Sequence, residues 1–409
     1  EDVPPGGWIA RCDLNGCNIQ IIANGLRNAY DLAFNGEGEL FTFDGDTEWD
    51  LGMPWYRPGA IHHVVSGGEY GWRPGTAKWP SHYEDGVAPV LEIGPATPKG
   101  LVFGTGANFP ARYQRALFAL DWRFGVIHAV HLRPEGASYR AESEIFASGK
   151  PLPVTDAVVG RDGALYVITG GRGANSALYR IVYTGSESTA PAKPTESPAA
   201  LKTRRGLEGL HRSGANGLDV AWTHLGSSDR ALRFAARVAL EHRPVADWRN
   251  RALGEQNPRA ALTALMALAR QGAPSDLEGI LEALRYLNYG DELDLQSGGL
   301  RVAALAFARL GAPEGALREA SLRALEMNYP VGIPRLDVML AELLVYLGSN
   351  TVVSSTVPAF EGGRAVLPAW AEILKRSGHA TLYGGTINRF LRRPPNFEAL
   401  RYAFTLRNA

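Results

Sequence analysis

The stretch Gly59-Ala60-Ile61-His62-His63-Val64 recurs in related form at residues 7–12, 125–130 and 176–181. A different motif, Ala269-Arg270-Gln271-Gly272-Ala273-Pro274, returns as Ala308-Arg309-Leu310-Gly311-Ala312-Pro313. Repeated strand motifs of the first kind are typical of β-propeller blades, whereas helix-ending motifs about 40 residues apart are typical of α-solenoids. The two repeats therefore predict a β-rich first half and a helical second half.

Composition divides the chain at the same place. Residues 1–185 alternate short β-rich runs with Gly, Pro, Asn and Asp turns, and residues 186–200 form a polar stretch that contains no large apolar residue. We predict a partial propeller of about three to four blades over 1–185, a linker over 186–200 and HEAT-like helix pairs over 201–409. A closed propeller needs about 4–8 blades, so the first part is not expected to close alone.

Local signals place individual helices in the second half. Asn257 is a typical N-cap and precedes Pro258, which suits the first helical position. Ser275, with Glu278 three residues later, indicates a capping box. Further helices are expected near 300–310, 314–327, 335–347 and 397–407.

Charge and hydropathy exclude several classes of protein. Lys+Arg and Asp+Glu both number 42, so nothing indicates a nucleic-acid partner. No apolar run reaches the ~18 residues of a membrane span. The first residues carry no signal-peptide pattern and no initiator Met, so we expect a processed or cut chain. Cys12 and Cys17 flank a turn, where they form either a disulfide or two unlinked thiols.

An acidic loop follows the strand-like residues 40–43. Its carboxylates alternate with other residues and would share one side if the strand continued. Such a group suits a hard cation such as Ca²⁺. The alternatives are a solvated acidic loop or one paired with Arg57 and Arg73. The candidate metal ligands are Asp44, Asp46, Glu48 and Asp50.

Large aromatic residues follow this loop. They are candidates to line a sugar or quinone pocket, although such residues also pack long loops between blades. The candidate pocket residues are Trp55, Tyr56, Arg57 and Trp72. His62 and His63 are neighbours in a strand and should point to opposite faces, so a structural role is expected for each. The sequence has no Cys-x-x-Cys-His motif and thus no covalent haem site.

Several strings resemble the glucose/sorbosone dehydrogenase family. They are Arg27-Asn28-Ala29-Tyr30-Asp31-Leu32-Ala33-Phe34, Gly68-Glu69-Tyr70-Gly71-Trp72 and Gly100-Leu101-Val102-Phe103. The resemblance implies a six-bladed propeller that binds pyrroloquinoline quinone and Ca²⁺. Within this resemblance, the match is closer to large multidomain proteins of planctomycete and verrucomicrobial type. In those proteins HEAT-like repeats and a C-terminal cytochrome c domain follow the propeller.

Carried over residue by residue, the resemblance gives a partial cofactor site. Arg27 and Asn28 match the family's quinone-contacting pair, and Arg123 stands where the family has a quinone-binding Lys. Tyr30 replaces a contacting Gln, and Pro153 and Thr155 replace a pair of arginines. These departures remove cations that the three carboxylates of the quinone would need.

The resemblance implies an exported, periplasmic oxidoreductase that acts on a sugar or alcohol. Its electrons would pass to a cytochrome c domain absent from this chain. The family's catalytic His belongs to blades that this chain lacks, so we expect no turnover from the chain alone. The alternative function is a non-catalytic propeller/HEAT scaffold that binds carbohydrate or protein partners.

Overall fold

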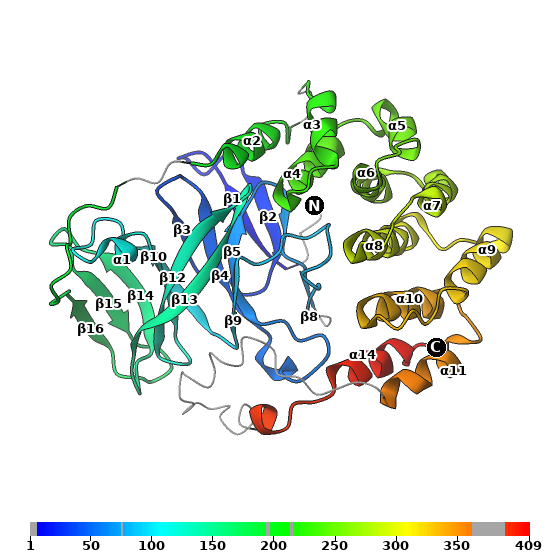
Figure 1. The fold of residues 1–409 in the computed structure, drawn as a ribbon. Coiled ribbons are helices and arrows are strands. Elements are labelled where there is room, and N and C mark those ends of the chain that lie inside the picture. The colour runs from blue at the N-terminus through cyan, green and yellow to red at the C-terminus, as the bar shows by residue number, and fades with distance from the viewer. Residues whose placement is uncertain (1–5, 75–76, 194–196, 213, 215, 362–388) are drawn as a thin grey trace. The chain divides into compact units, whose positions relative to one another are not determined.

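The computed structural model describes residues 6–74, 77–193, 197–212, 214, 216–361 and 389–409 (Figure 1). The chain divides into two compact units. Among the described residues, unit 1 holds those up to Ser81, those from Gly86 to Leu201, and 389–394. Unit 2 holds His82–Asp85, those from Lys202 to 361, and 395–409. Unit 2 therefore includes four residues from the β-rich half of the sequence.

The described part of unit 1 is built mainly from antiparallel sheets. Sheet 1 has the order β1-β2-β6, with β1 Gly7–Arg11, β2 Gln20–Leu26 and β6 Gly68–Glu69. Sheet 2 has the order β3-β4-β5-β9, with β3 Leu32–Phe34, β4 Leu40–Asp44, β5 Gly59–Val64 and β9 Leu91–Gly94. A two-stranded ribbon joins β7 Trp72–Arg73 and β8 Ala77–Lys78.

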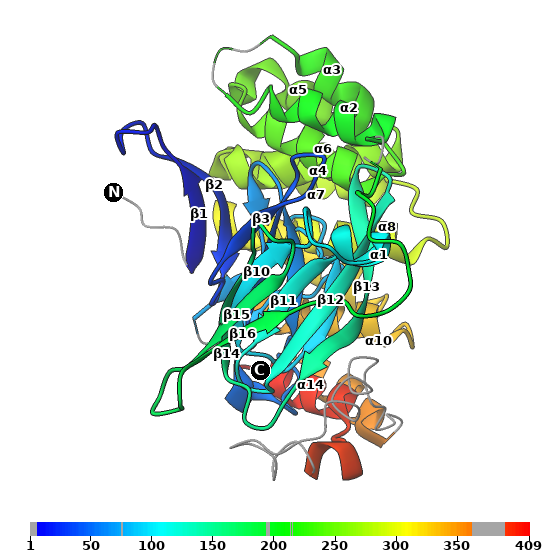
Figure 2. The ribbon, with the colours of Figure 1, turned by 90° about the vertical axis from the view of Figure 1, so that its left-hand side faces the viewer.

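Two further sheets follow in chain order, and Figure 2 shows their twisted strands. Sheet 3 has the order β10-β11-β12-β13, with β10 Pro98–Phe103, β11 Leu117–Asp121, β12 Val126–Glu135 and β13 Ser138–Ser148. Sheet 4 has the order β14-β15-β16, with β14 Val154–Val159, β15 Leu165–Thr169 and β16 Ala177–Ile181. The short helix α1 spans Ala111–Gln114.

Apolar clusters connect each of these sheets to the next. Ile9 and Leu26 of sheet 1 share a cluster with Val64 of sheet 2. Phe41 and Phe43 of sheet 2 share another with Leu117 of sheet 3. A third cluster joins sheets 3 and 4 through Phe118, Leu120, Ile127, Val154, Leu165 and Val167. Alternating strand residues supply these buried faces, as the period of two requires.

Unit 2 is helical and encloses one large apolar cluster. Trp222, Trp248, Leu265 and Phe307 are among its buried members. The long helices are α2 Ala199–Glu208, which begins in unit 1, α3 Leu218–Leu225, α4 Arg230–Glu241, α6 Pro258–Gln271, α7 Leu277–Tyr286, α8 Leu293–Leu310, α9 Gly315–Glu326, α10 Pro334–Tyr346 and α14 Phe397–Leu406. The short ones are α5 Arg249–Leu253 and α11 Val352–Thr356.

Helix ends test the local predictions. Asn257 caps α6, where its Oδ1 accepts N–H groups of Arg259 and Ala260 at 3.1 and 3.0 Å. The capping box expected at Ser275 is wrong. Asp276 instead accepts the N–H of Ala273 at 2.8 Å, because the 3-10 turn Pro274–Asp276 precedes α7.

A mixed fold of several sheets and a set of helices is thus confirmed, while the blade and HEAT-like assignments stay predictions. Cys12 and Cys17 are free and exposed. Within the described ranges, no helix is both long and apolar enough to cross a bilayer.

Candidate functional site

The loop between β2 and β3 carries Arg27 and Asn28, and the end of β4 fixes its backbone. Asp44, the last residue of β4, is fully buried. Its carboxylate accepts the N–H of Arg27 at 3.0 Å and that of Asn28 at 2.6 Å. The backbone of the loop is therefore held by Asp44, which leaves the side chains of Arg27 and Asn28 available for other contacts.

Lys78 neutralises this buried carboxylate. Its ammonium nitrogen lies 2.8 Å from Asp44 Oδ2, and both side chains are almost fully buried. Burial acts to raise the pKa of Asp44, but the charge of Lys78, together with hydrogen bonds from Lys78 and from the backbone of Arg27, holds that pKa below its ordinary value. His62 itself stays neutral, because burial and the charge of Lys78 lower its pKa to about 3.

Glu48 brings two predicted cofactor residues together. It begins the 3-10 turn Glu48–Asp50. Its carboxylate oxygens lie 3.2 Å from Arg27 Nη2 and 2.8 Å from Arg123 Nη2. Burial acts to raise the pKa of Glu48, yet hydrogen bonds and the charges of both arginines lower it, so the group is a carboxylate. A single anion therefore bridges two guanidinium groups that are distant in the sequence.

Two other aspartates behave differently, because burial outweighs the effect of their hydrogen-bond partners. Asp46 accepts the hydroxyl of Tyr56 and the N–H of Ala96, both at 3.0 Å, and burial raises its pKa to about 6. Asp121 ends β11 and accepts the N–H of Thr97 at 3.0 Å, and burial raises its pKa to about 7. Both carboxyls thus hold a proton for part of the time near neutral pH.

The acidic loop does not form one cluster. The strand ends at Asp44, and the carboxylates of Asp44, Asp46 and Glu48 each have different partners. Throughout the part of the chain that the structure describes, no group of three or more His, Cys, Asp or Glu side chains is placed to hold a metal. Ca²⁺ takes 6–8 oxygen ligands. The present donor set does not fit that requirement, and the metal assignment, Asp50 included, stays a prediction.

The predicted aromatic pocket residues contact separate neighbours. Tyr56 is buried and turns inward to Asp46. Arg57 donates to the carbonyl oxygen of Tyr56 at 2.8 Å, so it braces its own loop. Trp72 is half-buried and packs beside Gly6, and Trp55 is also half-buried. These contacts do not bring the four residues together into one pocket, and the predicted substrate pocket stays a prediction.

The sequence argument missed two cations, Lys99 and Arg172. The ammonium of Lys99 lies 4.7 Å from the ring centre of Tyr30, and the guanidinium of Arg172 lies 5.6 Å from that of Trp122. Partial burial and the charge of Arg172 lower the pKa of Lys99. The available sequence signal was the run Gly170-Gly171-Arg172-Gly173, whose Arg172 has a φ of 49°.

These contacts connect the cations into one group, which we name the cationic cluster: Arg27, Lys99, Arg123 and Arg172. Glu48 joins Arg27 to Arg123, Trp122 precedes Arg123 and lies against Arg172, and Arg172 influences Lys99. The cluster therefore has four positive side chains, and the ionised carboxylate of Glu48 bridges two of them. Such an excess of positive charge suits an anionic ligand with several carboxylates.

Comparisons with known proteins give partial likenesses. No family model and no curated protein matches. A glucose dehydrogenase-type oxidoreductase from Thermus thermophilus is 24% identical, with a TM-score of 0.32 over 39% of this chain and 46% of that one. A PQQ-bound aldose sugar dehydrogenase from Streptomyces coelicolor is 16% identical, with a TM-score of 0.30 over 39% and 44%. A third structure, a glucose dehydrogenase, is 19% identical, with a TM-score of 0.32 over 42% and 49%. The chain thus spans less than half the length of these sugar dehydrogenases, and part of it is similar to them.

Proposed function

We propose that this chain is part of a quinoprotein-type oxidoreductase of the sugar or alcohol dehydrogenase kind, and that the cationic cluster binds its quinone. The observation that carries the proposal is the bridge that Glu48 makes between Arg27 and Arg123. Lys99 beside Tyr30 and Arg172 beside Trp122 add two further positive charges. Pyrroloquinoline quinone bears three carboxylates, so it would balance the excess positive charge of this cluster.

Each part of the cluster has a distinct role in this proposal. The guanidinium groups of Arg27 and Arg123 would exchange Glu48 for ligand carboxylates, which planar guanidinium groups bind in a bidentate manner. The side-chain amide of Asn28 would add a neutral contact. Asp44 acts as a positioning residue, because it holds the backbone of Arg27 and Asn28.

Lys99 and Arg172 would compensate for the positive charges that this chain lacks relative to the family pattern. Pro153 and Thr155 lack the positive charges expected at those positions, and Tyr30 replaces an amide. Lys99 lies over Tyr30, and Arg172 supplies a second charge beside Trp122. We infer that these two cations replace the missing arginines from another part of the fold.

A bound quinone would accept the electrons of the sugar or alcohol. The residues of this chain would bind and orient it, and Asp46 and Asp121 would hold protons in the buried layer beneath. A substrate base, a cytochrome c partner and a periplasmic location belong to the whole protein and are proposed on the resemblance alone. The calcium ion is not included, because the carboxylates do not fit it.

Calorimetric titration with pyrroloquinoline quinone tests the proposal without requiring turnover. Arg123→Gln and Arg172→Gln should each weaken binding about tenfold or more, since a hydrogen bond to a charged group contributes about 1.5–3 kcal/mol. Arg112→Gln is the matched control, because Arg112 is 54% exposed and pairs with Glu187 outside the cluster. An absence of binding, or an equal loss in the control, would contradict the proposal and favour the scaffold alternative.

A second titration addresses the metal prediction. Ca²⁺ is added with and without the quinone, to wild type and to Asp46→Ala. Calcium that tightens quinone binding in wild type and fails to do so in the variant would restore the acidic loop as a metal site. Equal quinone affinity with and without Ca²⁺ would contradict the prediction of a metal site in the acidic loop. Quinone binding would then be attributed to the cationic cluster.

A further inference from the structure

The segment His82–Asp85 belongs to unit 2, although its neighbours in the sequence belong to unit 1. Tyr83 and Asp85 are buried, with Tyr83 8% and Asp85 0% exposed. Neither residue is part of the apolar cluster that the helices of unit 2 enclose. Polar contacts accompany the burial of the segment.

Arg301 of α8 recognises two side chains of the segment at once. Its Nε and Nη2 donate to the two oxygens of Asp85 at 2.9 and 2.7 Å, which is a bidentate pair. The same guanidinium stacks over the ring of Tyr83, 4.0 Å from its centre. Arg301 thus contacts both an aromatic residue, Tyr83, and an acidic residue two positions later, Asp85.

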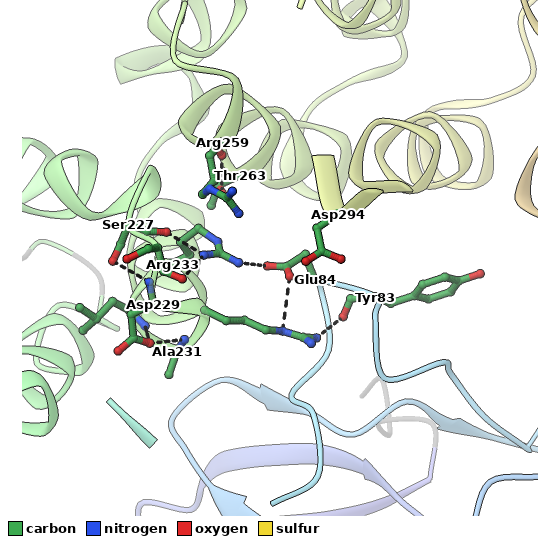
Figure 3. A network of polar contacts seen from close by, with 12 residues as sticks. Tyr83, Glu84, Ser227, Asp229, Ala231, Arg233, Arg259, Thr263 and Asp294 are labelled. Carbon is green, nitrogen blue, oxygen red and sulfur yellow. Dashed lines mark hydrogen bonds and ion pairs between the residues drawn. The ribbon is translucent and has the colours of Figure 1, made fainter. Parts of the chain in front are cut away.

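Two arginines of α4 recognise the middle of the segment (Figure 3). Arg233 Nη2 donates to Glu84 Oε2 at 2.8 Å, and Arg230 Nε lies 3.6 Å from Glu84 Oε1. Arg230 also donates to the main-chain carbonyl of Tyr83 at 2.6 Å. The contacts to both side chain and backbone resemble the way in which a binding protein holds an extended peptide.

Two of the arginines of α4 also bond to residues outside the segment. Arg233 donates to the carbonyls of Ser227 and Ser228 at 2.7 and 3.0 Å. Arg237 pairs with Glu241 of its own helix and also donates to the main-chain carbonyl of Asp85 at 3.5 Å. Burial acts to raise the pKa of Asp85, yet Arg301 and then Arg237 and Arg270 keep that pKa below its ordinary value. The bonds of Arg233 and Arg237 to their own helix and to its N-terminal turn hold these two side chains in place, which lowers the cost of binding an acidic ligand.

A small pocket adjoins Glu84 on the same surface. It is partly apolar and lies between α4, α6 and α8, lined by Glu84, Arg233, Phe234, Arg259, Leu262 and Met266. Figure 3 shows Arg233, Arg259 and Asp294 on its walls. The surface that receives the segment therefore continues beyond Glu84 over apolar side chains of α6.

We propose that the arginine-lined face of α4 and α8 is a binding site for an acidic peptide with an aromatic residue followed by two acids, and that Tyr83-Glu84-Asp85 occupies it as a ligand from the same chain. A protein partner that exposes such a sequence competes for the site. Because ion pairs and hydrogen bonds supply most of these contacts to the segment, a free peptide with the same charges can make the same contacts.

The test uses the whole chain and a labelled heptapeptide with the sequence of residues 81–87. Glu84→Gln/Asp85→Asn keeps the shape of the internal ligand and removes its charge. The peptide should bind this variant at least tenfold more tightly than wild type, as measured by fluorescence anisotropy. The matched control is Asp291→Asn/Glu319→Gln, two exposed acids of unit 2, which should behave as wild type does. A peptide with Gln and Asn in place of the two acids should bind none of them.

A second measurement uses wild type alone. It tests whether the segment is exchangeable even if the Glu84→Gln/Asp85→Asn variant does not fold. Hydrogen exchange of residues 82–87 in wild type should accelerate when millimolar charged peptide is added, because a tethered ligand has an effective concentration of that order. The neutral peptide should leave exchange unchanged. Unaltered exchange with the charged peptide, together with no binding to any folded variant, would show a permanent structural tie and overturn the proposal.

Discussion

Replacing Asp44 by Asn should loosen the loop that carries Arg27 and Asn28. Asn is nearly the same size and keeps one carbonyl oxygen for the two backbone donors. It removes the charge that neutralises Lys78, whose side chain is 7% exposed. The perturbation therefore leaves a buried ammonium unpaired, and packing changes little.

The expected magnitude follows from this unpaired charge. Removing one partner of a buried ion pair typically costs about 3–5 kcal/mol. If that energy is lost from the local structure, opening of the loop becomes roughly a hundredfold or more frequent, since each 1.4 kcal/mol is a factor of ten. The double variant Asp44→Asn/Lys78→Met removes both charges and should recover most of the loss.

Hydrogen exchange at the amides of Arg27 and Asn28 is the appropriate assay, because both N–H groups donate to Asp44. A global melting curve would mix the responses of two units. The folded pKa of Asp44 lies below 3.8, so its stabilisation is present above that pH and is lost only as the pH falls further. Measurements near neutral pH therefore compare fully ionised wild type with the variant.

Two results would refute this reasoning. Unchanged protection of both amides in Asp44→Asn would mean that the carboxylate does not hold the loop. A double variant that exchanges faster than the single one would mean that Asp44 and Lys78 stabilise the protein independently rather than as a pair.

Two further predictions concern unit 1. Because the folded pKa of Asp121 is raised to about 7, its contribution to stability is complete below about pH 4 and is lost as the pH rises through 7. Asp121→Asn should therefore flatten the pH dependence of thermal unfolding and be more stable than wild type at pH 8, and an unaltered profile would contradict this. A methyl group on Gly104 would lie 2.0 Å from the carbonyl oxygen of Tyr113, so Gly104→Ala should lower the melting temperature by several degrees. Gly36→Ala, which meets nothing within 4 Å, is its control, and equal shifts in the two variants would refute the steric explanation.

Signals that act within a few residues could be read from the sequence. Asn257 and Pro258 begin a helix because a cap depends only on the adjacent turn. The prediction at Ser275 failed by one residue, since the longer carboxylate of Asp276 reaches back to Ala273. A local motif likewise indicated that Arg27 and Asn28 lie just before a strand.

Contacts between distant segments could not be read in the same way. The alternating carboxylates of residues 44–50 suggested one shared site, but Lys78 and Arg123 arrive from other parts of the chain and separate them. Arg172 affects the pKa of Lys99 although the two residues belong to different parts of unit 1, and the sheets that carry them pack together. Charge pairing across sheets depends on the tertiary fold, which no local period encodes.

The aspartates that end β4 and β11 have a consequence for how this surface changes over generations. Asp44 holds the backbone of residues 27 and 28, and Asp121 holds that of Thr97. In each case a buried aspartate from another part of the sequence holds the backbone. The side chains of the held residues contribute little to the path of that backbone. Substitutions of the side chains at positions 27 and 28 are therefore expected to leave the path of their backbone in place. The ligand contacts made there can change over generations while Asp44 stays the same.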